Sequence, residues 1–382
     1  MATPVPKSCR TSIRYLRFND ESQPGAVLTL AVFSLTLLLP LLADLAHFTP
    51  YSGNFEKRLK ANRPSITIYE IIKETKLSRY PKQYTAFFND GFGLRNAMVR
   101  VYSLFKYRVL GTFQINNVVI GRDGWLYYTH REQASDPIAC YRGTNLMTNK
   151  ELAAVAHTLT MWRNHLHQSG YEVVLCVIPN KSTIIPEKLP TSVTRIRPKV
   201  RLDQLYDYLA QHTDLEVLDL RPNLLAHKTE PIFYKTDTHW TMQGAYIAYD
   251  QILRYIAASS LFPALTPKPP EAFSKNNEPR KGGDLANMII LSDVFRDWRG
   301  EMKIRPEADT NATQNKPRVT VVGDSFFENL TPFFVQHFNM TTIPISSEPT
   351  LAQVQQHNPI LIIIEIVERH LAKIPNWLRN YN

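Results

Sequence analysis

Three short runs of the sequence are apolar at almost every position, namely YEVVLCVIP (171–179), RVTVVG (318–323) and PILIIIEIV (359–367). Such runs are typical of strands buried on both faces, as in a parallel sheet that helices cover on each side. Segments with helical apolar spacing follow these runs or lie between them, over 198–212, 242–258 and 326–338. Strands that alternate with helices predict an α/β protein, and specifically a three-layer α/β/α domain with a mostly parallel sheet.

The residues on either side of the first run add four further elements. NVVIGRDGWLYY (117–128) is β-branched and aromatic around a central Asp-Gly, which predicts a hairpin. Apolar residues fall on one helical face over 149–168. Helical spacing also extends over 65–110, with an interruption around residues 89–91. The segment 262–283 is rich in Pro, Lys, Asn and Gly, which predicts a long surface loop.

One apolar block stands apart near the N-terminus. Residues 26–43, AVLTLAVFSLTLLLPLLA, carry no charge, and about 20 apolar residues are needed to cross a bilayer core. The alternative is a cleaved signal peptide, but the polar segment before the block is long and no A-x-A site follows it. We therefore predict an uncleaved transmembrane signal anchor. Basic residues flank it on both sides, so its orientation stays open, although a long globular remainder is expected to be exported.

These patterns predict four parts of the chain. They are a cytoplasmic tail (1–25), a transmembrane signal anchor (26–46), a linker with a helical lead-in (47–84) and a globular domain (85–382).

Composition and charge narrow the function only slightly. The net charge is +10, yet the 44 Lys and Arg are scattered, without a dense basic cluster interleaved with aromatics. That distribution argues against nucleic acid as a partner. A diffuse positive field fits an acidic polymer or a membrane surface, and equally a role in solubility.

The three cysteines point to no special chemistry. Cys9 lies in the N-terminal tail, which leaves Cys140 and Cys176 as the only intradomain pair. Cys176 lies within a predicted buried strand, so we expect a free thiol in the core. No Cys/His spacing suggests zinc.

The clearest candidate chemistry follows the second apolar run. The strand 318–323 ends in Gly323-Asp324-Ser325, and a helix is predicted to start at once. Ligands bind at the carboxyl ends of strands in parallel sheets, and backbone N–H groups at a helix start can face an oxyanion. The alternative is that Ser325 merely caps the helix, because serine is a favoured N-cap residue.

A second element complements this serine. Asp237 and His239 lie two residues apart just before the predicted helix 242–258. In extended structure, residues i and i+2 face the same side, so both can point into one site. A serine nucleophile needs a base within hydrogen-bond reach, and the imidazole needs an orienting acid. The pattern predicts a triad of Ser325, His239 and Asp237, although a lone histidine before a tryptophan is often structural.

The sequence also resembles a known family. D-T-H-W-T (237–241), followed by Gly244-Ala245 and by G-D-S-F (323–326), is similar to the alginate O-acetyltransferase AlgJ/AlgX family of the SGNH (GDSL-like) superfamily. The resemblance covers roughly residues 85–372. Four other segments resemble landmarks of the family and occur in the family's order. They are V-I-G-R-D-G-W-L-Y-Y (119–128), I-P-N-K-S-T-I-I-P-E-K-L-P (178–190), G-G-D-L (282–285) and V-E-R-H-L (367–371).

The resemblance implies an enzyme and its surroundings. It implies an SGNH-like fold, with Asp237 as the orienting acid, His239 as the base and Ser325 as the nucleophile of acetyl transfer to an exported polysaccharide. It further implies a multi-pass membrane acyltransferase partner that delivers acetyl groups, with this chain in the inner membrane and its catalytic domain in the periplasm. No metal or organic cofactor is implied. The alternatives are a membrane-anchored carbohydrate esterase with the same triad, and a non-catalytic polysaccharide-binding scaffold.

Four other residues are candidates for substrate or oxyanion contacts. Arg369 follows the last strand, where GDSL esterases usually carry an asparagine, and a Glu368–Arg369 pair joining two loops is the alternative reading. Asn180 and Lys181 end the strand 171–179. Trp125 in the hairpin has the ring to stack on a sugar, but a core tryptophan explains it equally.

Overall fold

The computed structural model describes residues 24–51, 53, 55, 60–64, 79–259, 261–310 and 315–379. The predicted cytoplasmic tail therefore lies almost wholly outside the described residues, as does part of the predicted lead-in. By its contacts the chain divides into two compact units, Met1–Ser52 with Leu59–Met98 and Gly53–Arg58 with Val99–Asn382.

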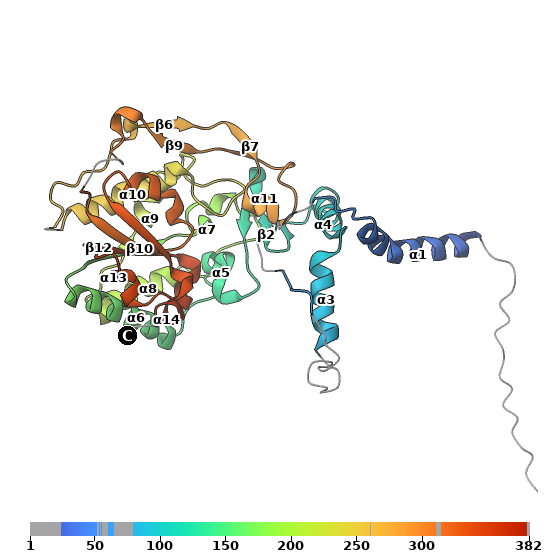
Figure 1. Cartoon of the computed structure of the whole chain (residues 1–382), viewed down its shortest axis with the longest axis horizontal. Coiled ribbons are helices and arrows are strands. Elements are labelled where there is room, and N and C mark those ends of the chain that lie inside the picture. Colours follow the sequence, from blue (N-terminus) through green and yellow to red (C-terminus); the bar gives the residue numbers. More distant parts are fainter. Residues whose placement is uncertain are drawn as a thin grey trace, which may run out of the picture. The chain divides into compact units, whose positions relative to one another are not determined.

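The second unit is built on a five-stranded parallel sheet (Figure 1). The strand order is β11 (Asn339–Pro344), β10 (Arg318–Gly323), β12 (Leu361–Val367), β4 (Glu172–Ile178) and β5 (Leu218–Asp219). Every neighbouring pair runs parallel. The three predicted strands form the centre of the sheet. The two edge strands lack a continuous apolar run, since β5 has two residues and β11 contains only exposed and half-buried positions.

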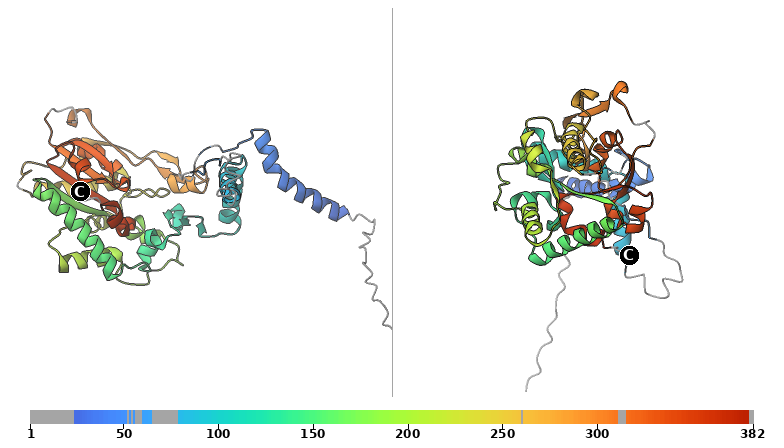
Figure 2. Two further views of the ribbon diagram at one scale, coloured as in Figure 1. Left: turned by 60° about the horizontal axis from the view of Figure 1, so that its bottom comes forward. Right: turned by 90° about the vertical axis from the view of Figure 1, so that its left-hand side faces the viewer.

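Helices cover both faces of this sheet (Figure 2). Successive side chains of the central strands enter opposite cores, as β geometry requires: Cys176 packs with α10 (Met242–Ala257) on one face, and Val177 packs with α6 (Asn149–Gln168) and α8 (Arg201–His212) on the other. The predicted three-layer domain is confirmed. The shorter helices are α5 (Pro137–Arg142), α7 (Lys181–Ile184), α9 (Arg221–Ala226), α11 (Asp284–Met288), α12 (Thr331–Phe334), α13 (Leu351–Gln355) and α14 (Ile374–Trp377).

The hairpin forms as predicted. β2 (Val118–Ile120) pairs antiparallel with β3 (Leu126–Tyr128), and β1 (Gln114–Ile115) adds a third strand. Asp123 and Gly124 make the turn with φ of 55° and 76°, the left-handed region that Gly and Asp tolerate best.

Two predictions for this domain are wrong. The segment 262–283 is not one long loop, because β6 (Phe273–Asn276) and β7 (Pro279–Lys281) pair with β9 (Glu301–Ile304) and β8 (Arg296–Trp298). These strands are largely exposed, so their sequence is polar. The segment 326–338 is not one helix either. It breaks into the 3₁₀ turn η7 (Phe327–Asn329) and α12, which has Pro332 in its first turn, where proline's missing N–H is tolerated.

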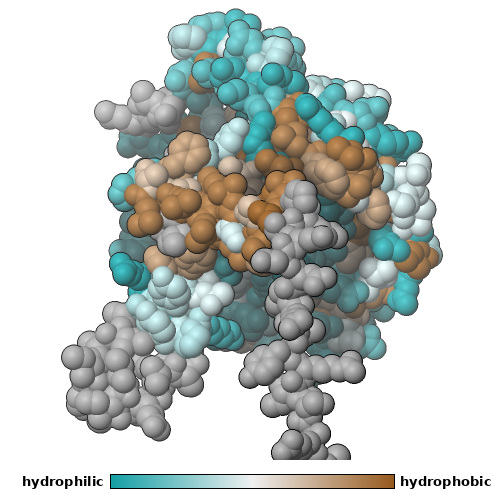
Figure 3. Space-filling view, turned by 90° about the vertical axis from the view of Figure 1, so that its right-hand side faces the viewer, coloured by the Kyte–Doolittle hydropathy of each residue, from teal (hydrophilic) through white to brown (hydrophobic). Residues whose placement is uncertain are grey.

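The first unit contains α1 (Pro24–Leu45) and α3 (Tyr80–Gly91). The boundary between the two units falls within α4 (Arg95–Leu104), and α4 is followed by a π-helical turn, η1 (Phe105–Val109), in the second unit. Helix α1 carries exposed apolar side chains, such as Leu30 and Phe33. Figure 3 shows a hydrophobic area on the face of the molecule that it views. Among the residues that the structure describes, none of the helices is long and apolar enough to span a bilayer. The predicted transmembrane anchor over 26–46 is therefore not confirmed.

The predicted free thiol is confirmed. Cys140 and Cys176 are both buried and neither forms a disulfide.

Candidate active site

Ser325 lies in the turn directly after β10. Its residue is exposed, whereas Gly323 before it and Phe326 after it are buried. The carboxylate of Asp324 accepts hydrogen bonds from the N–H of Phe326 (2.9 Å) and of Val367 (3.1 Å), which fixes the turn against the end of β12. The nucleophile candidate is thus held at the carboxyl edge of the sheet, and does not cap a long helix.

Asp237 and His239 lie in the extended segment that leads into α10. Thr241 caps this helix by accepting a hydrogen bond from the N–H of Gly244. Two hydrogen bonds join the segment to the serine turn, from Trp240 Nε1 to the Phe326 carbonyl (3.0 Å) and from Asn329 Nδ2 to the Trp240 carbonyl (2.9 Å). Residues 86 positions apart in the chain are thereby placed side by side.

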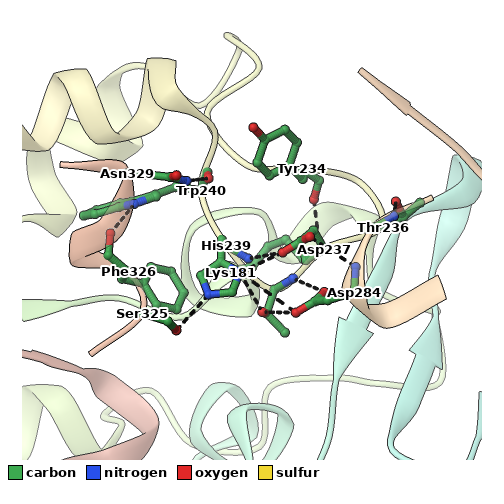
Figure 4. Close-up of polar contacts among 12 residues, drawn as sticks. Lys181, Tyr234, Thr236, Asp237, His239, Trp240, Asp284, Ser325, Phe326 and Asn329 are labelled. Carbon is green, nitrogen blue, oxygen red and sulfur yellow. Dashed lines mark hydrogen bonds and ion pairs between the residues drawn. The ribbon is translucent and has the colours of Figure 1, made fainter. Parts of the chain in front are cut away.

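The three predicted residues form one continuous hydrogen-bonded chain (Figure 4). His239 Nε2 lies 2.9 Å from Ser325 Oγ, and His239 Nδ1 lies 2.7 Å from Asp237 Oδ1. With the proton on Nδ1, the lone pair of Nε2 faces the serine hydroxyl. This is the arrangement in which an imidazole can take a proton from a hydroxyl.

The environment of Asp237 keeps its carboxylate charged. Burial opposes ionisation, but hydrogen bonds from His239 and from the Asp284 N–H hold the pKa of Asp237 well below its usual value. The Arg280 guanidinium lies 3.9 Å from Asp237 Oδ2. Gly283 is required here, because a Cβ would lie 2.6 Å from that same oxygen.

Lys181 binds the backbone of the segment that carries Asp237 and His239. Its residue is 5% exposed, and its Nζ donates to the backbone carbonyls of Tyr234 (3.1 Å), Lys235 (3.2 Å) and Asp237 (2.7 Å). Burial lowers the pKa of Lys181 to about 8. Since an ammonium has three N–H donors, the geometry indicates that Lys181 positions the acid–base segment instead of contacting substrate.

Asn180 and Arg369 line a small pocket together with Thr238, with a cavity volume of about 10 Å³. Asn180 is 1% exposed, and among the described residues neither polar atom of its side chain has a partner. The Arg369 guanidinium lies over the rings of Phe326 and Tyr128. Glu368 does not pair with it but accepts from Asn180 N–H (2.9 Å) and Thr183 Oγ1 (2.6 Å). The pocket thus joins the ends of β4 and β12 beside the histidine segment.

Trp125 is a core residue, which favours the structural reading. It is 8% exposed and packs edge-on against Trp298, with ring centroids 6.3 Å apart. Both tryptophans line a hollow of about 420 Å³, together with Lys188, Lys228 and Glu230.

Two acids beside the triad were not singled out from the sequence. The Asp284 carboxylate accepts from both the N–H and the hydroxyl of Thr238, and the buried Glu365 accepts from the N–H of Asp324. The G-G-D-L landmark contains Asp284, but no local pattern gave it a role. Glu365 interrupts an otherwise apolar strand. This pattern indicates a buried polar contact, but it does not identify the residue that Glu365 contacts.

Asp237, His239 and Asp284 are also a group of metal-ligand type, since their potential ligand atoms lie within 4.8 Å of one another. In the described residues each of these atoms already takes part in a hydrogen bond, and coordination would break the bond between His239 and Asp237. The donor set therefore fits proton transfer better than a resident ion.

Comparison with known proteins identifies the family. Residues 118–345 match the model of the SGNH hydrolase-like domain of acetyltransferase AlgX. The chain belongs to this family of AlgJ/AlgX-like proteins. The matched range spans the positions of Asp237, His239 and Ser325. The five-stranded parallel sheet agrees with the fold that the family implies.

Several relatives carry the name probable alginate O-acetylase AlgJ. The chain is 30% identical to that of Pseudomonas putida over 187 residues, which are 47% of this chain and 43% of the relative. It is 25% identical to that of Pseudomonas fluorescens over 271 residues, 66% of this chain and 63% of the relative. The matches thus span less than two thirds of either relative. Bacillus cereus PatB1, solved with a sulfonyl adduct, shares the fold at 14% identity, with a TM-score of 0.51, 71% of this chain and 100% of that chain covered.

Proposed function

We propose that this protein is a serine-dependent O-acetyltransferase that acts on an exported polysaccharide. The observation that carries the proposal is the hydrogen-bonded chain from Ser325 through His239 to Asp237, in a turn that exposes the serine. The family and the names of the relatives support acetylation of a polysaccharide.

The proposed reaction has two steps. In the first, His239 Nε2 takes the proton of Ser325 Oγ as the oxygen bonds to the acetyl carbonyl carbon. The donor's leaving group then departs with a proton, and an acetyl-serine remains. In the second, His239 takes the proton of a sugar hydroxyl, the sugar oxygen bonds to the acetyl carbon, and Ser325 leaves and regains its proton. Asp237 holds the imidazole tautomer and stabilises its cationic form.

The oxyanion of each step needs two donors. We assign the Ser325 backbone N–H as one. For the second we propose Arg369 or the Asn180 amide, supported by their shared pocket beside Thr238. Arg369 and Asn180 thus stay candidates for contact with the substrate. Lys181 and Trp125 are instead proposed to hold the structure around the site.

The wider setting stays a proposal too. We propose residues 85–382 as the acetyltransferase domain, located in the periplasm, with a multi-pass membrane acyltransferase as acetyl donor partner. Inner-membrane anchoring through residues 26–46 rests on the uncharged apolar run over 26–43. Alkaline extraction of membranes tests it: an anchored chain stays in the pellet, and release into the supernatant contradicts the anchor.

The decisive experiment is mass spectrometry of the protein after exposure to an activated acetyl ester. We expect an acetyl adduct on Ser325 that is absent in Ser325→Ala and reduced at least about a thousandfold in rate in His239→Ala. An adduct at another residue contradicts the assigned nucleophile.

A second assay separates transfer from hydrolysis. Oligosaccharide added to the acetylated protein should gain the acetyl group. Ester hydrolysis that is unaffected by sugar, without acetylated product, identifies a carbohydrate esterase instead. Unchanged polymer acetylation in cells that carry Ser325→Ala identifies a non-catalytic scaffold.

A further inference from the structure

Asp284 lies on the far side of the histidine from the serine, in the first turn of α11. Its Oδ1 accepts from the Thr238 N–H (2.8 Å), and its Oδ2 accepts from the Thr238 hydroxyl (2.6 Å). The same Oδ2 lies 3.9 Å from His239 Nδ1. Its own N–H donates to Asp237 Oδ2 (3.1 Å). Asp284 therefore contacts the acid of the triad and the residue between acid and base.

The Thr238 hydroxyl connects this second carboxylate to the imidazole. Because the hydroxyl donates its single proton to Asp284, its oxygen can only accept at His239 Nδ1, 3.2 Å away. The Nδ1 proton thus points between Asp237 Oδ1 at 2.7 Å and Thr238 Oγ1 at 3.2 Å. A carboxylate behind Thr238 polarises its hydroxyl toward the imidazole.

We propose that Asp284 is a positioning residue for the triad, whose negative charge stabilises the cationic form of His239 through Thr238. The proposal rests on the proposed catalytic function of His239. When the imidazole takes the serine proton, its new charge lies near two carboxylates and not one. That charge develops only in the transition state and the intermediates, so stabilising it accelerates the reaction.

Other charged groups around the histidine do not replace this role. Asp237 is the direct partner. Arg280 lies beside Asp237 Oδ2, Lys181 is bonded to the Asp237 carbonyl, and Arg369 lies over the Phe326 ring, which contacts His239 with centroids 4.8 Å apart. These three are cations, which oppose an imidazolium. Burial and the charge of Asp237 raise the pKa of Asp284, as expected for two acids that share one site.

Asp284→Asn provides the main test, since it removes the charge while retaining an oxygen that can accept from Thr238. We expect the maximal rate of Ser325 acetylation to fall by about tenfold. We also expect the acid limb of the pH–rate profile to move to lower pH, because an imidazole that has lost a nearby negative charge binds its proton less tightly. Asp293→Asn is the matched control, an exposed acid paired with Arg100, and should leave both unchanged.

A second readout does not depend on activity. Histidine-selective NMR of the full chain follows the imidazole of His239 with pH, assigned among the 11 histidines by its absence in His239→Gln. Its titration midpoint should lie at lower pH in Asp284→Asn than in the wild type. Thr238→Val should give a shift in the same direction, and Thr238→Ser should restore the wild-type midpoint.

The outcomes separate the two proposals. A lower midpoint in a protein that transfers no acetyl group supports the role of Asp284 and contradicts the proposed function. An unchanged midpoint in both Asp284→Asn and Asp284→Ala overturns the role of Asp284, whatever the activity. A loss of activity in Asp284→Asn with no movement of the acid limb identifies a purely structural carboxylate and also overturns it.

Discussion

At the residue scale, the serine turn is supported by a pair of buried acids whose pKa values shift in opposite directions. Burial opposes ionisation of Asp324, but the nearby His370 and Arg369 hold its pKa below the usual value. Glu365 is fully buried, and burial together with the charge of Asp324 raises its pKa well above the usual value. Its Oε2 accepts from the Asp324 N–H at 2.8 Å. The two buried carboxyl groups therefore differ in how strongly they hold a proton.

This difference predicts a pH-dependent stability. Because the pKa of Glu365 is higher in the folded state than in the unfolded state, its contribution is complete below the unfolded pKa and is lost as pH rises toward the folded pKa. Glu365→Gln keeps the acceptor and cannot ionise. The unfolding free energy of Glu365→Gln, relative to that of the wild type, should therefore rise by about 1.4 kcal/mol per pH unit between the unfolded and the folded pKa of Glu365.

Denaturant unfolding at several pH values above the ordinary range of glutamate measures this advantage. Glu278→Gln, at an exposed position, is the control and should show no such trend. A difference between Glu365→Gln and wild type that stays constant with pH contradicts a raised pKa of Glu365.

At the scale of elements, the ends of the central strands and a small separate sheet together position the residues of the site. The carboxyl ends of β10, β12 and β4 bring together Ser325, Arg369 and Asn180, as expected for adjacent parallel strands. The small β7–β8 sheet holds the acid–base segment through Asp297. Positioning of the triad therefore depends on elements that contribute no triad residue.

Gly323, the last residue of β10, leaves space for the acid below it. A Cβ at this position would lie 2.7 Å from Glu365 Oε2, and both residues are buried. We expect Gly323→Ala to lower the unfolding free energy by about 1–3 kcal/mol and to slow Ser325 acetylation. Gly91→Ala, where nothing lies within 4 Å of the added atom, should change neither in thermal unfolding and acetylation assays. Wild-type behaviour of Gly323→Ala would show that the turn can shift without cost.

Asp297 fixes the start of the acid–base segment. Its residue is 4% exposed, and its carboxylate accepts from the N–H groups of Lys235 (3.2 Å) and Thr236 (2.8 Å) and from the Thr236 hydroxyl (2.5 Å). Asp297→Ala leaves these donors unpaired, so we expect about 1–3 kcal/mol of destabilisation and a roughly tenfold to hundredfold loss of acetylation rate. Thermal unfolding and acetylation kinetics check both, with Asp293→Ala as control. Unaltered kinetics would exclude a role for β8 in positioning the site.

At the scale of the whole molecule, the α/β unit is held by two packed cores and needs no disulfide. The two faces of the sheet each carry a cluster of buried apolar side chains. Cys176 lies within the first of these clusters, and both described cysteines are free. Stability therefore comes from burial of apolar surface on both faces.

Thiol chemistry tests this view of the core. Burial raises the pKa of Cys140 to about 12, and it also raises that of Cys176 well above the usual value. In a Cys9→Ser background, a thiol reagent should find no reactive group in the folded protein and two after unfolding. The melting temperature should be the same with and without reductant. A melting temperature that falls in reductant would reveal a stabilising disulfide.

The sequence alone determined the central strands, the major helices and the pairing of Asp237 and His239 with Ser325. Apolar runs and helical spacing are local patterns, and a D-x-H segment faces one side by strand geometry alone. Only the tertiary structure placed Lys181, Asp284 and Glu365 beside the triad and the serine turn, because each is linked there by hydrogen bonds to residues at least 41 positions away. The tertiary structure also decided the secondary structure of two segments. In 262–283, pairing with strands β8 and β9 overrides the loop-like composition. In 326–338, the helix is broken and restarts at α12, which has a proline in its first turn.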